Sequence, residues 1–428
     1  MSFPRYESYK DSGVEWLGEV PEHWVCKPFW TLYRRTKRTG YVNEQLLSVY
    51  RDYGVIPKAS RDDNNNKPSD DLNPYQLVKV GDLAINKMKA WQGSVAISEY
   101  QGIVSPAYFV YESTNDEISR FLHYLMRSSR YITGYLTLSK GIRVNQWDLE
   151  PQYHSRMSVV LPPKDEQQII ATFLDRETAK IDALIAEQQR LIELLKEKRQ
   201  SVISHAVTKG LNPNVPMKDS GIEWLGEVPK HWGVVPLRWF ASCASGNGIS
   251  IEQVETEADT KQLVPVIGGN GVMGYTNLVN VKHSILAVGR VGALCGNVHI
   301  VNPPAWVTDN ALILDAAPNA FDLTYLASVL RSRNLNDIAS KTAQPLITGT
   351  QVRDQRVPQP PLEEQSAIVN FLDRETAKLD TLTTEAKTAI TLLQERRTAL
   401  ISAAVTGKID VRGLVSAKTE VQAETVPC

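Results

Sequence analysis

The sequence has no long apolar run, no clustered cysteines and no excess of positive charge. No stretch approaches the ~20 apolar residues of a membrane span, and the amino terminus has no apolar signal core. We therefore expect a cytoplasmic protein without a membrane anchor. Its cysteines, Cys26, Cys243, Cys295 and Cys428, are scattered, with no CxxC pair and no histidine at ligand spacing. This pattern argues against disulfides and against a zinc site.

The charge balance limits how the chain could bind nucleic acid. Its 47 Lys and Arg residues are offset by 48 Asp and Glu residues, which gives a net charge of −1. DNA-binding proteins usually carry a basic excess. The chain could therefore bind DNA only if its positive residues gather on particular faces, or if partner subunits neutralise many of the phosphates. At 428 residues it is also too long for one compact core.

The most informative feature that is present is an internal repeat. Thirteen of the fifteen residues from Lys10 to Trp24 recur from Lys218 to Trp232. A second block, Phe-Leu-Asp-Arg-Glu-Thr-Ala-Lys, begins at Phe173 and again at Phe371. The sequences between the two blocks differ almost completely. We assign residues 1–155 and 211–355 to two variable domains, 156–210 and 356–412 to two long helical segments, and 413–428 to a flexible tail.

Heptad spacing predicts that both helical segments are long amphipathic helices. Each opens with a proline pair followed by acidic residues, and Gly210 and Gly407 lie where each helix should end. We place apolar seam residues at Leu174, Ile181, Leu184, Leu191, Leu195 and Val202, with counterparts at Leu372, Leu379, Leu382, Ala389, Leu393 and Leu400. Three polar residues fall at seam positions and would fix the register: Gln188, Lys198 and Arg396.

Helices this amphipathic need a partner surface. We expect the two to pair as an antiparallel coiled coil; the alternative is that each docks separately on its own domain. The variable regions contain short strand-like runs, at 79–86, 95–97, 283–288 and 298–301, and plausible helices at 118–126 and 323–330. The expected fold class is thus α+β: two mixed α/β domains and two long helices, with an internal pseudo-two-fold repeat.

The order and content of these blocks resemble the specificity (S) subunit of type I restriction–modification systems. The resemblance covers nearly the whole chain. It includes both Glu-Trp-Leu-Gly-Glu-Val-Pro-x-His-Trp motifs, both helix starts (Pro162 to Gln167 and Pro360 to Gln365) and both Phe-Leu-Asp-Arg-Glu-Thr-Ala-Lys blocks.

The resemblance implies a function without catalysis in this chain. Each variable region would be a target recognition domain that reads one half of a bipartite, asymmetric DNA sequence, and the coiled coil would set the unread spacer. The chain would bind double-stranded DNA, two modification (methyltransferase) subunits and restriction (motor–nuclease) subunits. It would hold no cofactor itself, because S-adenosylmethionine, ATP and Mg²⁺ would be bound by those partners. We expect half-sites about one helical turn (~34–36 Å) apart, or a little more.

Three short strings imitate enzyme motifs but lack the context that the chemistry needs. Gly269 to Gly274 matches GxGxxG, yet no helix start follows it. Asn302-Pro-Pro-Ala305 lacks the aromatic residue that would stack on a flipped base. Glu385-Ala-Lys387 resembles a nuclease Glu-x-Lys but falls on a predicted helix. We interpret them as a loop or hairpin, a turn and a solvated helix face.

Candidate DNA contacts in the first domain fall into three groups of basic, aromatic and amide residues. A dense basic cluster could contact phosphates or could be a solvated surface: Arg34, Arg35, Lys37 and Arg38. Two further groups mix residue types as readers of base edges do: Lys87, Lys89, Trp91 and Gln92, and then Lys140, Arg143, Asn145 and Gln146.

The second domain offers comparable candidates, chosen because arginine and asparagine bond bidentately to guanine and adenine edges. They are Asn247, Asn270, Arg290, Asn297, Asn310, Lys341 and Gln344. Trp16, Trp24, Trp224 and Trp232 are duplicated, so we assign them to the framework core. Two rival functions remain open: an autonomous methyltransferase or nuclease that carries these domains, and a purely structural coiled-coil scaffold.

Overall fold

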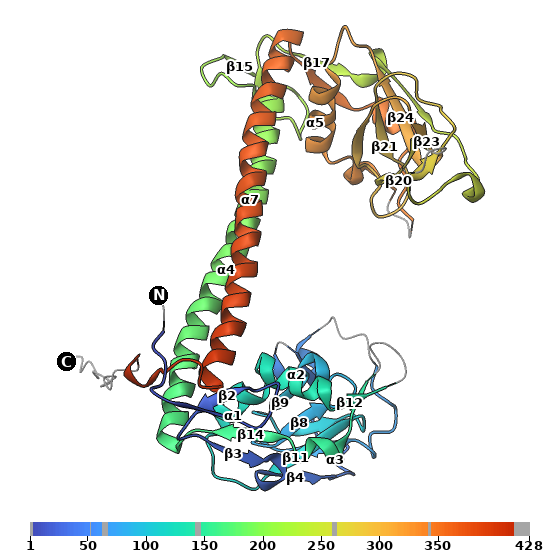
Figure 1. The fold of residues 1–428 in the computed structure, drawn as a ribbon. Helices are drawn as coiled ribbons and strands as arrows, with labels where there is room; N and C mark the ends of the chain where they lie inside the picture. Colours follow the sequence, from blue (N-terminus) through green and yellow to red (C-terminus); the bar gives the residue numbers. More distant parts are fainter. Residues whose placement is uncertain are drawn as a thin grey trace, which may run out of the picture. The chain divides into compact units, whose positions relative to one another are not determined.

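The computed structural model describes residues 3–51, 53–61, 67–141, 147–258, 263–340 and 344–414. The chain divides into two compact units (Figure 1). Unit 1 is Met1–Gln188 with Thr388–Cys428, and unit 2 is Gln189–Lys387. Each unit therefore takes in one variable region together with part of both long helices.

Unit 1 is built on a four-stranded antiparallel sheet. The strand order is β4 (Tyr33–Thr36), β11 (Tyr108–Ser113), β8 (Leu83–Asn86) and β9 (Val95–Ile97). Antiparallel strand pairs surround it: β1 (Tyr9–Asp11) with β2 (Glu19–Pro21), β3 (Val25–Pro28) with β14 (Ser158–Leu161), β5 (Leu47–Tyr50) with β6 (Gly54–Pro57), β7 (Gln76–Val78) with β10 (Gly102–Val104), and β12 (Ser139–Lys140) with β13 (Asp148–Leu149). Its shorter helices are α1 (Ser119–Met126), α2 (Ser129–Thr137) and α3 (Pro151–His154).

Unit 2 repeats this plan on a different sequence. Its four-stranded antiparallel sheet has the order β18 (Ala241–Ser245), β24 (Ala311–Ala316), β21 (Ile285–Gly289) and β22 (Val298–Val301). The other strands are β15 (Met217–Asp219) with β16 (Glu227–Pro229), β17 (Gly233–Pro236) with β25 (Arg356–Gln359), and a sheet of β20 (Gly271–Thr276), β19 (Val264–Gly268) and β23 (Trp306–Val307). Its shorter helices are α5 (Leu323–Arg333) and α6 (Gly349–Arg353). The expected mixed α/β domains are thus confirmed, and each predicted run contains a strand or helix, although residues 79–82 of the run 79–86 precede β8 as a turn.

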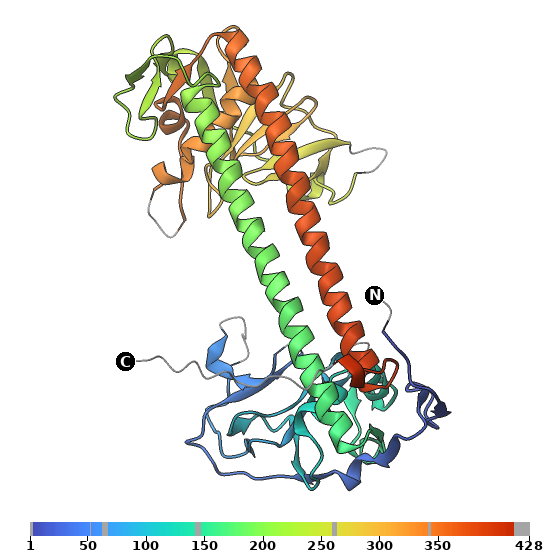
Figure 2. The ribbon, with the colours of Figure 1, turned by 90° about the vertical axis from the view of Figure 1, so that its left-hand side faces the viewer.

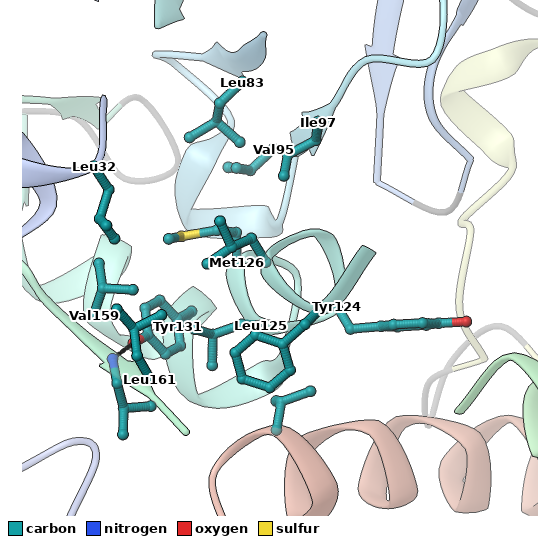
Figure 3. Close-up of a cluster of buried hydrophobic side chains, with 14 of the residues drawn as sticks. Leu32, Leu83, Val95, Ile97, Tyr124, Leu125, Met126, Tyr131, Val159 and Leu161 are labelled. Carbon is teal, nitrogen blue, oxygen red and sulfur yellow. Dashed lines mark hydrogen bonds between the residues drawn. The ribbon is translucent and has the colours of Figure 1, made fainter. Parts of the chain in front are cut away.

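Both faces of each main sheet are covered, because side chains along a strand point alternately to opposite faces. In unit 1, Leu83 and Ile85 belong to the main core, whereas Ala84 between them belongs to a smaller cluster behind the sheet. Figure 3 shows the main core, where Leu83, Val95 and Ile97 approach Met126 of α1. Unit 2 alternates in the same way along β21. The central strands β8 and β21 are therefore packed on both faces.

The two long helices, α4 (Lys164–Lys209) and α7 (Leu362–Val405), pack against each other and run in opposite directions (Figures 1 and 2). In unit 1 the amino-terminal half of α4 shares a core with the carboxyl-terminal half of α7, through Ile181 and Leu400. In unit 2 the other halves meet, through Val207 and Ile368. The antiparallel coiled coil is confirmed. Separate docking of each helix on its own domain is not what the structure shows.

The seam of the coiled coil differs in part from the predicted one. Leu174, Ile181 and Leu195 are buried in α4, and Leu372 and Leu400 in α7, as expected. However, Leu184, Leu191 and Leu382 are 50%, 40% and 46% exposed. Ile192 is buried and Ile185 half-buried in place of their leucine neighbours. Each of these pairs offers two adjacent apolar residues, and heptad spacing alone does not decide which one faces the partner helix.

The same one-residue shift corrects two of the predicted polar seam positions. Lys198 and Arg396 are exposed, and their neighbours make the contacts between helices. Arg397 pairs with Asp182 at 2.8 Å in unit 1, and Arg199 pairs with Asp380 at 3.3 Å in unit 2. Gln188 is half-buried. Ion pairs of this kind at the flanks of a coiled coil help to set partner choice and orientation.

The first repeated block, Lys10 to Trp24 and Lys218 to Trp232, is called the opening motif here. It holds the first turn of each long helix. In unit 1 the indole of Trp24 donates to Oε1 of Glu166 at 3.0 Å, and His23 Nε2 lies 2.8 Å from Oε2. In unit 2, Trp232 and His231 make the same contacts with Glu364, at 2.9 and 2.7 Å. Trp24 and Trp232 are buried, and Trp16 and Trp224 pack partly buried against the cores. The framework role predicted for the four tryptophans is confirmed.

A buried glutamine beside each glutamate ties the helix to its domain. The Gln167 amide donates to the carbonyl of Pro162 at 2.9 Å, and its Oε1 accepts from the Ile118 amide at 3.0 Å. Gln365 repeats both bonds with Pro360 and Asp322, at 2.9 and 2.7 Å. The sequence repeat therefore encodes the same contact between opening motif, domain and long helix in both units. We call this contact the joint.

Glycine closes each long helix, as predicted. Gly210 and Gly407 have φ of +75° and +70°, the left-handed region that favours glycine. At Gly407 a Cβ atom would also lie 2.3 Å from Cδ of Pro21, so the close approach of the opening motif adds a second reason for glycine.

Candidate nucleic-acid interface

The two main sheets carry equivalent loops at the same end of their strands, which we call the loop edge. The β8–β9 loop begins at Lys87 and the β21–β22 loop at Arg290. The amide of Lys87 donates to the Ala107 carbonyl at 3.4 Å, and its own carbonyl accepts from the amide of Leu149 at 2.9 Å. The amide of Arg290 donates to the Asn310 carbonyl, and its carbonyl accepts from the Ile347 amide, both at 2.9 Å. Lys87 and Arg290 thus occupy the same structural position.

In unit 2 the structure brings most of the predicted residues together at this edge. The Asn297 amide donates to Oδ1 of Asn270 at 3.1 Å. The Arg290 guanidinium donates to Oγ of Ser245 at 3.0 Å and to the Asp309 carbonyl at 3.2 Å. Asn310, the next residue, is exposed and follows the same turn. These contacts hold the arginine and the two amides in place before any ligand arrives.

Two other predicted residues of unit 2 lie beside this group. Asn247 is exposed; its Oδ1 accepts from the Asn280 amide at 3.0 Å, and its carbonyl accepts from the indole of Trp306 at 3.2 Å. Gln344 is exposed and directly precedes Pro345, whose carbonyl accepts from the Gly292 amide at 2.9 Å. Lys341 lies outside the described residues.

In unit 1 the equivalent edge carries a hollow of about 350 Å³. Lys89, Trp91 and Gln92 line it, as members of one predicted group. The ring of Trp91 packs on Trp147 with centroids 4.8 Å apart. The lining combines cationic, aromatic and amide groups, the set that contacts phosphates and bases.

The remaining predicted residues of this edge are held by neighbours or fall outside the structure. Lys87 pairs with Asp148 at 3.0 Å, and the Lys140 ammonium lies 4.6 Å from the ring centroid of Tyr153. Three residues of the last group lie outside the described residues: Arg143, Asn145 and Gln146.

The basic cluster on β4 and just after it lies on an edge strand and is largely engaged within the protein. Arg34 pairs with Glu112 at 2.9 Å, and Arg38 pairs with Asp82 at 2.7 Å and with Glu112 at 3.2 Å. Hydrogen bonding from Arg34, with the charge of Arg38 nearby, lowers the pKa of Glu112. Arg35 lies 4.3 Å from the ring centroid of Phe109, and Lys37 is exposed. These contacts favour the solvated-surface interpretation; phosphate contact by this cluster stays a prediction.

Sequence reasoning missed several residues that the fold brings to the two edges. Lys58, Lys67, Tyr75 and Tyr108 line the hollow of unit 1. In unit 2, a Cβ atom on Gly271 would lie 3.6 Å from the His299 ring, so this histidine is next to the Asn270 turn. Burial, with nearby Arg331, lowers the pKa of His299, so its ring is neutral near pH 7. No local pattern marks these residues, because only strand pairing places them beside the predicted loops.

The enzyme-like strings take the forms expected of them. Gly269 and Asn270 form the turn of the β19–β20 hairpin, Asn302 to Pro304 lie in the turn after β22, and Glu385 to Lys387 lie within α7. Within the described ranges, no cluster of three or more His, Cys, Asp or Glu side chains could hold a metal ion. In that same part of the chain, no helix is both long and apolar enough to cross a membrane.

Comparison with known proteins agrees with this architecture. The model of the family described as "Type I restriction modification DNA specificity domain" matches residues 38–194 and 229–392. The chain is 24% identical over 438 residues to the type I restriction enzyme EcoKI specificity subunit of Escherichia coli strain K12, covering 92% of this chain and 90% of that protein. It is 22% identical over 445 residues to the putative type I restriction enzyme MjaX specificity subunit of Methanocaldococcus jannaschii, covering 96% and 99%.

Solved structures show the same fold. A chain from a structure on the complex assembly and conformational transition of a type I R-M system has a TM-score of 0.69 at 16% identity, covering 90% of this chain and 98% of that one. The HsdS subunit from Thermoanaerobacter tengcongensis has a TM-score of 0.52 at 17% identity, covering 91% and 98%. The repeated frame, the paired helices and the family match lead to one conclusion: this chain belongs to the DNA specificity subunits of type I restriction–modification systems, which recognise DNA and are not catalytic.

Proposed function

We propose that each recognition domain reads one half of a bipartite, asymmetric DNA target. The observation that carries this proposal is the equivalence of the Lys87 and Arg290 loops on two sheets of the same strand order. Loops on a rigid scaffold are where recognition residues usually lie. Because the scaffold is repeated and the loops are not, the two domains perform one task on different sequences.

The different side chains at the two edges support unlike half-sites. Unit 1 presents lysines, Trp91 and Gln92, whereas unit 2 presents Arg290 among the asparagines Asn270 and Asn297. Arginine bonds bidentately to guanine and asparagine to adenine, each worth about 1–3 kcal/mol of discrimination. A palindromic target is therefore not expected.

In this proposal the coiled coil sets the unread spacer and binds two modification subunits. Leucines remain exposed on the helices of each unit: Leu184 and Leu392 in unit 1 (50% and 59%), and Leu194 and Leu382 in unit 2 (51% and 46%). We propose these leucines as contacts for the modification subunits. Two similar frames would suit two identical partners in approximate two-fold symmetry.

Partner subunits also account for the charge balance and for the chemistry. A net charge of −1 leaves much of the phosphate neutralisation to other chains. We propose that the modification subunits bind S-adenosylmethionine and methylate adenine, that restriction subunits supply the ATP- and Mg²⁺-dependent activities, and that base flipping takes place outside this chain.

The test is to reconstitute the chain with its modification subunits and map methylated adenines on a random DNA library. The proposal predicts one motif with two unlike half-sites and a fixed gap. The chain alone, incubated with labelled methyl donor and DNA, should transfer no methyl groups. Appreciable transfer by the chain alone would support the autonomous-enzyme rival, and DNA binding without sequence preference would support the scaffold rival.

A further inference from the structure

The two copies of the opening motif differ in one respect that the repeat makes visible. In unit 1 the ring of Tyr6 covers the joint between the motif and α4. Its hydroxyl donates to Oε1 of Glu166 at 2.5 Å, and its ring centroid lies 5.7 Å from that of His23 and 5.8 Å from that of Trp24. Tyr6 is 5% exposed, so it closes the joint.

Unit 2 has no aromatic residue at the corresponding position. The register is fixed by the backbone, because the amide of Glu22 donates to Ser8 O and the amide of Lys230 donates to Pro216 O, at 3.1 and 2.8 Å. Counting back two residues from Ser8 gives Tyr6, and from Pro216 gives Asn214. Asn214 is exposed.

A hollow of about 210 Å³ lies at this joint in unit 2. His231 and Glu364, the counterparts of His23 and Glu166, form part of its wall, together with apolar residues that include Pro229 and Ile368. The Glu364 side chain is 42% exposed, whereas that of Glu166 is only 6% exposed. The joint of unit 2 is thus open where the joint of unit 1 is filled.

The size and the lining of the hollow match a phenol ring. A single benzene ring fits an apolar cavity of about 150 Å³, so one ring fits here. The carboxylate of Glu364 accepts from His231 and Trp232 and keeps capacity for a further donor, as Glu166 shows by accepting from Tyr6 as well. The segment that leads into the motif of unit 2, residues 211–217, contains no aromatic residue and so offers no ring of its own.

We propose that the hollow of unit 2 receives a tyrosine side chain from a partner subunit, bound with its hydroxyl on Glu364. The proposal rests on the proposed function for the presence of partner subunits. It follows that the two nearly identical frames are not equivalent to their partners: the joint of unit 1 is closed by its own chain, and the joint of unit 2 is completed from outside.

The first test measures binding of p-cresol, the tyrosine side chain as a free molecule, to the full-length chain by calorimetry and ligand-observed NMR. We expect one saturable site in the millimolar range. Asn214→Tyr, which restores the plug from within, and Ala367→Trp, which fills the hollow from α7, should each abolish it. Ala377→Trp, at an exposed position farther along the same helix, should leave it unchanged.

Unit 1 serves as an internal standard for the same measurement. Tyr6→Ala should open the matching site and raise the stoichiometry from one p-cresol to two. If the wild-type chain shows no saturable binding, or if neither blocking variant reduces it, the proposal is overturned. This arm uses no partner, so it is independent of the proposed function.

The second test measures assembly with the modification subunits. Asn214→Tyr and Ala367→Trp should weaken assembly at least ten-fold, and p-cresol should compete with it, whereas Tyr6→Phe should assemble normally. Normal assembly of both blocking variants would overturn the proposal. Failure of the wild-type chain to assemble at all would instead count against the proposed function.

Discussion

Lys87 and Arg290 hold the same position in two sheets whose sequences are unrelated at that edge. Each begins the loop between the third and fourth strands in sheet order, and each backbone joins the same two neighbouring segments. One residue is a lysine paired with Asp148, and the other is an arginine held by Ser245 and the Asp309 carbonyl. A shared backbone position with different side-chain chemistry is what two readers of unlike sequences require.

Arg290→Ala should relax recognition in one half-site only. If Arg290 forms a bidentate contact with a base, its loss reduces discrimination at one position by about 1–3 kcal/mol, roughly 5- to 150-fold. The measurement is the methylation of DNA duplexes with single substitutions in either half. Arg238→Ala, which removes an exposed arginine paired with Asp354, is the control and should change neither half. Altered preference in both half-sites would contradict the division of reading between the domains.

Lys89→Ala should weaken DNA binding evenly across sequences. If its ammonium contacts a phosphate, the slope of log affinity against log salt should fall by about 0.9. Titrations of the complex with modification subunits at several salt concentrations give this slope. Lys180→Ala removes a lysine that pairs with Glu177 on α4, and it should leave the slope unchanged. An unchanged slope in the Lys89 variant would remove this residue from the interface.

Gln365→Ala should destabilise the joint between α7 and its domain. The variant leaves the Ala320 and Pro360 carbonyls and the Asp322 amide without their side-chain partner. Buried groups left unpaired cost about 1–3 kcal/mol of the free energy of unfolding. Thermal or denaturant unfolding measures the loss. Ser366→Ala, at the exposed neighbouring position, is the control. Equal stability of the two variants would show that the joint does not depend on this glutamine.

His154 should make unit 1 sensitive to acid. Its ring is fully buried against Phe29 and Tyr111, and burial lowers its pKa from 6.5 to about 3. The folded state thus keeps the ring neutral while the unfolded chain binds a proton below pH 6.5. The contribution of His154 to the free energy of unfolding is therefore complete above pH 6.5, and it falls by about 1.4 kcal/mol per pH unit from there toward pH 3. His154→Phe should flatten that part of the unfolding profile between pH 6 and 4; an identical slope in both proteins would rule this histidine out as its cause.

Much of the fold follows from the sequence, because the repeat marks both opening motifs and both long helices, and strand-like runs mark the two sheets. Side-chain choices within elements were less visible. Leu184 and Ile185 are both apolar, so heptad spacing could not decide which one enters the seam. The pairing of Arg34 with Glu112 depends on strand register across a long separation. For the same reason Lys58 and Lys67 were not predicted as neighbours of Lys89.

The candidate site was predictable as a set of loops but not as a surface. Arginine and asparagine next to strand ends identified the region around Arg290 correctly as a loop cluster. Which residues share one edge depends on strand order, which no local pattern reveals. Tyr6 and Asn214 illustrate the limit: the repeat pairs them in the sequence, but only the structure shows that Tyr6 bonds to Glu166, 160 residues away.

We propose above all that each domain recognises its own half-site and that the coiled coil fixes the distance between the two half-sites. Inserting one heptad into the middle of both α4 and α7 lengthens the coiled coil by about 10 Å, which corresponds to roughly three base pairs. Methylation mapping with the reconstituted complex should then show both half-sites unchanged and the gap between them longer by about that amount. An unchanged gap, or altered half-sites, would contradict the account.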